Sequence, residues 1–199
     1  DNMAIPNNGY SIRVKEMEAG SGELRLGQLL VMDPSGANPS LPGEACKEPA
    51  FGLPAAWVAE ALREEAAFKG YTIVDPATVL TTHLTEVIKD NMADLLSIAE
   101  VQRLTKELSP EHQKLVEDTV PSQVSWATVQ RVLQSLLRER VSIRDLASIM
   151  EAISEATSMD AVSLIEHVRA RLARQLCFQN CAADGSLPIV ALSPKWEQA

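Results

Sequence analysis

Residues 50–57 have the sequence AFGLPAAW, and this stretch decides the fold expected for the first half of the chain. It is apolar and is interrupted by Gly52 and Pro54. From Pro54 onward, apolar side chains recur at the spacing of one helix face, so we expect a helix over residues 54–69 that ends before Gly70. Phe51, in the loop before this helix, then indicates either a tight structural corner or a docking surface.

Short apolar segments on either side of this helix predict β-strands, because they alternate in polarity or form brief apolar runs. These segments are residues 10–15, 28–33 and 71–74. Residues 19–22, with the sequence AGSG, predict a turn. Residues 34–49 are rich in Pro, Gly, Ser and Asn and predict a mobile surface loop. The first half of the chain thus has the order strand, strand, helix, strand, which indicates a small α+β unit.

The rest of the chain carries a succession of helix-start signals. Asp75 followed by Pro76 is an N-cap with proline at the first helical position, which predicts a helix over residues 76–92. Further starts place a capping residue before an amphipathic segment: Ser97 with Glu100, Ser109-Pro110, Ser125, Ser142 with Asp145, and Met159-Asp160. Residues 95–175 therefore predict a compact all-helical domain, and a strand is expected over residues 187–192.

The composition limits the classes of function. Of the 199 residues, 46% are hydrophobic, which suffices for a real core, but only 4% are aromatic, so aliphatic side chains must build it. The net charge of -9 disfavours nucleic-acid binding, which requires a concentrated basic face, and electrostatic binding to anionic lipid. No signal peptide is evident, and no apolar run approaches the roughly 20 residues of a membrane span. Protein partners are compatible with the acidic balance.

The sequence offers no residue set for catalysis or metal binding. The cysteines, Cys46, Cys177 and Cys181, are too few for a disulfide framework, and the last two lack a second pair of zinc ligands. His83 belongs to no known nucleophile–base or zinc motif, so we interpret it as structural. No glycine-rich loop is followed by the Lys-Ser/Thr of a phosphate site. We therefore expect no enzyme activity, no cofactor and no metal.

Several ordered segments resemble the family of bacterial type III secretion export-gate proteins that includes FlhA, LcrD and InvA. They are residues 9–14, 29–34, 49–57, 70–84, 114–118, 129–134 and 141–146. Several motifs at matching spacing are a far more specific signal than any single one. The sequence Thr82-His83-Leu84 resembles the flagellar branch of the family, and the virulence injectisome branch is the alternative.

This resemblance implies that the chain is part of a longer protein with an N-terminal membrane-spanning part and a cytoplasmic region of four subdomains, which assembles into a nine-membered ring. Both ends of the chain would then be cut from something longer. The expected fold class is α+β, divided as follows: residues 1–26 and 76–94 in a first α/β subdomain, 27–75 in the small α+β subdomain with loop 34–49, 95–175 in the all-helical subdomain, and 176–199 at the truncated start of a C-terminal α/β subdomain.

The same resemblance implies a docking site for complexes of export chaperones with their substrates, in a cleft between the first two subdomains. In the family this site includes an acidic residue, the Phe of a Phe-Gly-Leu-Pro motif and the Thr of Thr-His-Leu. Here these positions are Glu48, Phe51 and Thr82. The family commonly has Asp where this chain has Glu48, whose side chain is one methylene longer. An exposed Phe in an apolar groove suits an interface anchor, and an acidic flank adds orientation.

Simpler interpretations stay open at this point. Phe51 could pin its loop to Trp57, Glu48 could be a solvated loop charge, and Thr82 could be a neutral surface residue of a helix. For the whole chain, the favoured hypothesis is a docking platform that binds chaperone–substrate complexes and passes them to the membrane export gate, with other export-apparatus proteins as partners. The alternative from a different class is a structural module whose helical domain mainly makes contacts within a ring.

Overall fold

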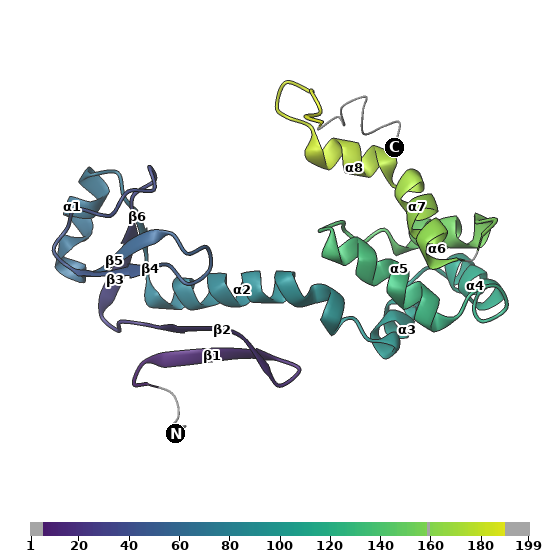
Figure 1. Cartoon of the computed structure of the whole chain (residues 1–199), viewed down its shortest axis with the longest axis horizontal. Helices are drawn as coiled ribbons and strands as arrows, with labels where there is room; N and C mark the ends of the chain where they lie inside the picture. Colours follow the sequence, from purple (N-terminus) through teal and green to yellow (C-terminus); the bar gives the residue numbers. More distant parts are fainter. Residues whose placement is uncertain (1–5, 159, 190–199) are drawn as a thin grey trace, which may run out of the picture. The chain divides into compact units, whose positions relative to one another are not determined.

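The computed structural model describes residues 6–158 and 160–189, and the chain divides into two compact units, Asp1–Asn91 and Met92–Ala199. The described part of the first unit combines β-sheets with helices, and that of the second is helical (Figure 1). The expected α+β class is therefore confirmed, while the finer division into subdomains stays a prediction. Across the described ranges, no helix combines the length and the apolar composition needed to cross a lipid bilayer.

The first unit is built around a four-stranded antiparallel sheet with the order β4-β5-β3-β6. Its strands are β3 (Gln28–Met32), β4 (Glu44–Lys47), β5 (Pro54–Ala59) and β6 (Thr72–Val74). The chain leaves β5 through a 3-10 turn (Glu60–Leu62) and α1 (Arg63–Phe68), and α2 (Pro76–Leu95) follows β6. The strands predicted at residues 28–33 and 71–74 are confirmed, and β4 occupies part of the predicted loop.

The helix predicted over residues 54–69 is wrong in its first half, because residues 54–59 form the central strand β5. This strand pairs with β3 on one side and β4 on the other. Since both of its faces are covered, it buries consecutive side chains to 5% exposure or less: Ala55, Ala56, Trp57 and Val58. Such a strand shows no alternation of polarity, so its apolar run imitates a helix. The predicted helix end is confirmed, with Gly70 at a φ of 73°.

The side chains of β3 and β5 alternate between two apolar clusters on opposite faces of the sheet. One cluster contains Ala66 of α1 together with Leu29, Val31, Ala56 and Val58. The other contains Val79 of α2 together with Leu30, Ala55 and Trp57. Each face of the sheet is therefore held by one helix, and the second face carries the start of α2 (Figure 1).

A separate antiparallel hairpin precedes the sheet and consists of β1 (Gly9–Val14) and β2 (Met17–Glu23). The strand predicted at residues 10–15 is confirmed, but the turn predicted at residues 19–22 is wrong, because these residues continue β2. The chain reverses instead around residues 15 and 16, which have φ values of 49° and 68°.

Gly20 and Gly22, on which the turn prediction depended, lie where neighbouring side chains pack closely against β2. A Cβ atom on Gly20 would lie 2.8 Å from Nε2 of His83 and 3.0 Å from Cγ2 of Val87, both on α2. A Cβ atom on Gly22 would lie 2.7 Å from the hydroxyl oxygen of Tyr10. Glycine inside a strand often marks a site where a neighbour packs closely, and here the hairpin packs against the helix that carries Thr82.

The second unit consists of short helices around one aliphatic core. The helices are α3 (Ile98–Lys106), α4 (Pro110–Thr119), α5 (Trp126–Arg138), α6 (Leu146–Glu155), α7 (Ala161–Arg171) and α8 (Ala173–Asn180). The completely buried core side chains include Val101, Val129, Val132, Leu133, Leu136, Ile149, Met150, Ile153, Leu164 and Val168. This aliphatic composition agrees with the shortage of aromatic residues in the sequence.

Most of the predicted helix starts are confirmed by cap hydrogen bonds. The side chains of Ser97, Ser125 and Asp160 accept backbone N–H groups of α3, α5 and α7. The predicted start at Ser142 is wrong, because Asp145 caps α6 directly before Leu146, the first buried residue of that helix. Asp and Ser are comparable N-caps, so the nearer one to the buried face prevails.

Two other predictions at helix or strand ends have different outcomes. Pro110 begins α4 as expected, but the Ser109 hydroxyl hydrogen-bonds to Nδ1 of His112, at 2.7 Å, and not to the helix backbone. The strand predicted over residues 187–192 is absent from its described part, residues 187–189, which have no regular structure. Residues 190–192, like Met159 of the predicted Met159-Asp160 start, lie outside the described residues.

A charged network joins α4, α6 and α7. Oε1 of Glu151 lies 3.1 Å from Nε2 of His112, and Oε2 lies 3.2 Å from a guanidinium nitrogen of Arg171. Hydrogen bonds, first from His112 and then from Arg171, hold the pKa of Glu151 below its usual range. A carboxyl group with a lowered folded pKa stabilises the fold above its unfolded pKa of about 4.3, and this stabilisation is lost as pH falls through the folded pKa.

We therefore expect the free energy of unfolding of the wild type to fall more steeply than that of Glu151→Gln as the pH falls from about 5 to about 3. Urea denaturation at a series of pH values measures both slopes. The control is Glu64→Gln, which removes an exposed carboxylate of α1 that has no ion pair among the described residues. Parallel pH profiles for the wild type and Glu151→Gln would contradict this expectation.

Candidate functional site

The three residues that the family resemblance singles out line one cavity of about 300 Å³ in the first unit. Glu48 and Phe51 come from the loop between β4 and β5, and Thr82 comes from α2. The strands β3 and β6, the loop that carries Phe51 and the helix α2 all contribute to the apolar wall. The remaining lining residues are Leu30, Met32, Asp33, Pro34, Gly36, Leu53, Thr72, Val74 and Val79. The fold thus places segments that are distant in sequence around one apolar space.

Glu48 is buried to 4% exposure, so its interpretation as a solvated loop charge is wrong. Its carboxylate accepts hydrogen bonds from the backbone N–H of Ala50 at 2.9 Å and of Phe51 at 2.7 Å. Its own N–H donates to the carbonyl of Leu53 at 2.8 Å, and its carbonyl accepts from the N–H of Gly52 at 2.9 Å. Glu48 therefore closes the loop 48–53 from within.

Phe51 projects from this loop at the edge of the cavity and is 60% exposed. It therefore does not act as a core residue that pins the loop to Trp57, which is buried in the sheet. Leu53, two residues later, also lines the cavity and is 46% exposed. Together the two side chains form an exposed apolar rim on a loop that is held by internal hydrogen bonds.

Thr82 is half-buried on α2 and supplies a polar group to the cavity wall. The hydroxyls of Thr81 and Thr85, on the same helix, donate to backbone carbonyls of the preceding turn. That of Thr78 donates to Asp75. The Thr82 hydroxyl has no hydrogen-bond partner among the described residues. It is therefore available to a molecule that occupies the cavity.

Asp33 gives the cavity its second carboxyl group, at the end of β3. Hydrogen bonds from Ser35, first from its hydroxyl and then from its backbone N–H, hold the pKa of Asp33 below its usual range. The group is consequently a carboxylate at neutral pH. The cavity thus combines a mainly apolar wall with two carboxyl groups, of which that of Glu48 is bonded within its own loop, and a threonine hydroxyl. This combination favours an apolar side chain flanked by hydrogen-bond donors.

His83, next to Thr82 on α2, makes a structural contact, in agreement with its interpretation from the sequence. Its ring is 7% exposed, and its Nδ1 shares a hydrogen bond of 2.7 Å with the hydroxyl of Tyr10 on β1. Burial, and to a lesser extent the negative charge of Glu48, raise the pKa of Tyr10 to about 12. Tyr10 therefore stays protonated and ties the hairpin to α2 beside Thr82.

Sequence reasoning missed Leu53 and Asp33, which line this cavity, and Tyr10, which lies outside its lining but contacts α2. Leu53 lay within the apolar stretch 50–57 and could have been added by its exposure in a loop. Asp33 directly follows an apolar strand, a position at which polar residues often reach a site, and that signal was available. Tyr10 gave no sequence signal, because its contact with His83 depends on the packing of the hairpin against α2.

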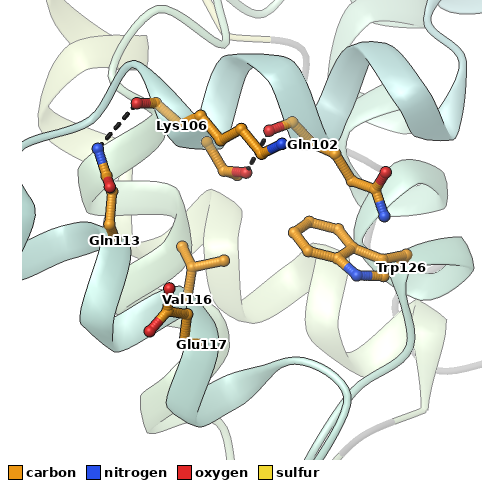
Figure 2. Close-up of a pocket in the computed structure, with 7 residues that line it drawn as sticks. Gln102, Lys106, Gln113, Val116, Glu117 and Trp126 are labelled. Carbon is orange, nitrogen blue, oxygen red and sulfur yellow. Dashed lines mark hydrogen bonds between the residues drawn. The ribbon is translucent and has the colours of Figure 1, made fainter.

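A second cavity, of about 270 Å³, lies in the helical unit between α3, α4 and the start of α5. Figure 2 shows Trp126 on one side and Gln113 and Glu117 on the other, with Lys106 extending toward Gln102. Its polar groups are partly used internally, since the Gln113 amide donates to the carbonyl of Lys106 at 2.8 Å. None of the predicted site residues lines this cavity. In the described part of the chain, no cluster of His, Cys, Asp or Glu is arranged for a metal ion.

The whole chain, residues 1–199, matches the model of the FHIPEP family. The chain belongs to the FHIPEP family. One FHIPEP relative, the flagellar biosynthesis protein FlhA of Caulobacter vibrioides, is 65% identical over 201 residues, and the alignment covers 100% of this chain and 29% of that protein. The chain therefore spans less than a third of the length of this curated relative. These matches confirm the resemblance to export-gate proteins that we predicted from the sequence motifs.

Solved structures show the same fold. The structure of the Chlamydia pneumoniae CdsV and CdsO protein complex matches with a TM-score of 0.80 and 26% identity, covering 100% of this chain and 60% of that one. The cryo-EM structure of nonameric EPEC SctV-C matches with a TM-score of 0.63 and 17% identity, covering 98% of this chain and 67% of that one. The second likeness, at this low identity, concerns the fold alone.

Proposed function

We propose that the chain is part of the cytoplasmic docking platform of a flagellar type III protein export apparatus. It binds complexes of export chaperones with their substrates and passes them to the membrane export gate. The observation that carries this proposal is the cavity in which Glu48, Phe51 and Thr82 meet, with Phe51 exposed at its edge. The high identity to a flagellar relative favours the flagellar branch over the injectisome branch.

The chemistry of the cavity supports docking of a protein side chain. A space of about 300 Å³ accepts one large apolar side chain, and the exposed rim of Phe51 and Leu53 adds contact area around it. Aromatic residues at the centre of an interface contribute much of the binding free energy. The Asp33 carboxylate at the edge favours basic or hydrogen-bond-donating groups beside that anchor.

The proposed mechanism is differential binding without covalent chemistry. A chaperone that carries substrate binds the cavity, and motion between subdomains releases the substrate toward the gate. In the intact protein, the partners include other export-apparatus proteins and further copies of the protein in a nine-membered ring. An N-terminal part supplies the attachment to the membrane. No cofactor, metal or nucleic acid enters this mechanism.

Calorimetric titration of the chain with a purified flagellar chaperone–substrate complex tests this proposal. We expect saturable binding with one complex per chain, and a negative heat-capacity change from the burial of apolar surface. A titration with an unrelated acidic protein of similar size is the control. The absence of heat at protein concentrations up to about 100 μM, which corresponds to a binding free energy weaker than about -5.5 kcal/mol, would overturn the proposal.

A ring-forming module is the second candidate function, because the family resemblance implies that the intact protein assembles into a nine-membered ring. In that case the helical unit mainly contacts neighbouring copies. Light scattering over a range of concentrations distinguishes the two, since ring formation predicts a mass that rises with concentration, whereas docking alone predicts a constant mass.

A further inference from the structure

We infer that Glu48 is a positioning residue that acts through Phe51, and that its carboxylate does not bind the docked partner. This inference rests on the proposed function, because it assigns a role within the same cavity. It differs from the role that the family resemblance implies, in which the acidic residue flanks the partner and orients it.

The internal hydrogen bonds of Glu48 and its burial leave its carboxylate poorly accessible to an external partner. One carboxylate oxygen accepts from Ala50 and the other from Phe51. The side chain is also almost completely buried, at 4% exposure. For a partner to bind the carboxylate directly, these N–H groups would lose their acceptor or share it, which is unfavourable for a buried donor.

The same hydrogen bonds fix the backbone from which Phe51 projects. The N–H groups of two consecutive residues point at one charged acceptor, and bonds to charged groups are about twice as strong as neutral ones. Gly52, with a φ of 69°, completes the tight loop, and its N–H returns to the carbonyl of Glu48. The backbone that carries Phe51 is consequently held in one conformation, although most of the surface of the side chain is exposed.

Such an arrangement increases affinity by pre-organisation. An exposed aromatic side chain on a flexible loop loses conformational freedom when it docks, and that loss opposes binding. A loop already held by Glu48 loses less. The carboxylate therefore strengthens docking without a hydrogen bond of its own to the partner, and its effect requires the presence of the Phe51 side chain.

A double-mutant cycle tests this dependence. Affinities for the flagellar chaperone–substrate complex are measured for the wild type, Glu48→Gln, Phe51→Ala and the double variant. Gln retains the size of the side chain but replaces one acceptor oxygen with an amide group that cannot accept. We expect Glu48→Gln to weaken binding about tenfold in the wild type, and to cause no further loss in the Phe51→Ala background. Glu64→Gln, an exposed carboxylate on α1, is the matched control.

The cycle has two outcomes that overturn the inference. If the losses from Glu48→Gln and Phe51→Ala multiply, Glu48 contacts the partner directly. If Glu48→Gln binds as tightly as the wild type, the carboxylate has no role in docking. In either case the proposed docking function itself survives, because the wild type still binds.

Hydrogen exchange provides a second test that needs no partner. We expect the amides of Ala50 and Phe51 to exchange at least about tenfold faster in Glu48→Gln than in the wild type, while amides of the sheet keep their rates. Unchanged rates at these two amides would overturn the positioning role. If the wild type fails to bind the complex but these amides respond as expected, the docking function is rejected while the loop-ordering effect of Glu48 stands.

Discussion

Replacement of Phe51 by alanine is expected to weaken binding of a flagellar chaperone–substrate complex by at least about 30-fold, which corresponds to roughly 2 kcal/mol. The side chain lies at the edge of the cavity on a pre-formed loop, the position expected of an interface anchor. Because Phe51 is 60% exposed in the free protein, its removal should change the free energy of unfolding by no more than about 0.5 kcal/mol.

The chain provides a matched control for this variant. Phe68 on α1 is 92% exposed and does not line the cavity, so Phe68→Ala removes the same chemical group from an unrelated surface. We expect Phe68→Ala to bind as the wild type does. Calorimetric titration measures the affinities and urea denaturation the stabilities. An equal loss of affinity in both variants, or a large loss of stability in Phe51→Ala, would count against the docking role of Phe51.

Replacement of Gly20 by valine is expected to destabilise the fold by about 1–3 kcal/mol. The new Cβ would lie 2.8 Å from the imidazole of His83 and 3.0 Å from Val87, closer than carbon atoms tolerate. Either the hairpin moves away from α2 or the His83 ring leaves its hydrogen bond with Tyr10. The first movement exposes apolar surface, and the second leaves a buried polar group without its partner.

Ser21→Val, one residue further along β2, is the control for Gly20→Val. It introduces the same side chain into the same strand without the steric conflict, so it shows the effect of strand propensity alone. Ser21 is exposed, and valine favours strands, so this variant should be as stable as the wild type or slightly more stable. Urea denaturation followed by circular dichroism measures both free energies of unfolding. A Gly20→Val variant as stable as Ser21→Val would show that the hairpin does not pack against α2 as described.

The sequence allowed prediction of elements whose signals are local. Asp75 and the serines before α3 and α5 accept hydrogen bonds from N–H groups a few residues later, and the glycine after α1 adopts a positive φ; all of these features are present in the structure. The α+β class followed from such local patterns. Local patterns were insufficient where long-range packing decided the outcome.

Strand β5 illustrates this limit most clearly. Residues 55–58 are buried because β3 and β4 flank them and a helix covers each face, and none of these neighbours can be inferred from the segment itself. The run AAWV satisfies a helix pattern equally well. The turn predicted around Gly20 was wrong for the same reason. The space that a side chain at position 20 would need is occupied by His83, which is more than 60 residues away in the sequence.

The candidate site was predicted only through the family resemblance. Composition and spacing gave no reason to group Glu48, Phe51 and Thr82, which line one cavity only because the chain folds the loop 48–53 and α2 around it. The burial of Glu48 was also unpredictable, since a glutamate in a Pro- and Gly-rich loop is normally solvated. Its two backbone acceptor contacts became evident only in the folded loop.

Site-specific photo-crosslinking tests most directly the claim that this cavity receives the partner. A benzophenone-bearing amino acid is placed at position 53 on the rim of the cavity, and in separate variants at position 102 beside the helical cavity and at position 68 on α1. Each variant is irradiated with a flagellar chaperone–substrate complex. Our account predicts a covalent adduct with the chaperone from position 53 and none from positions 102 or 68. Adducts from position 102 without any from position 53 would contradict it.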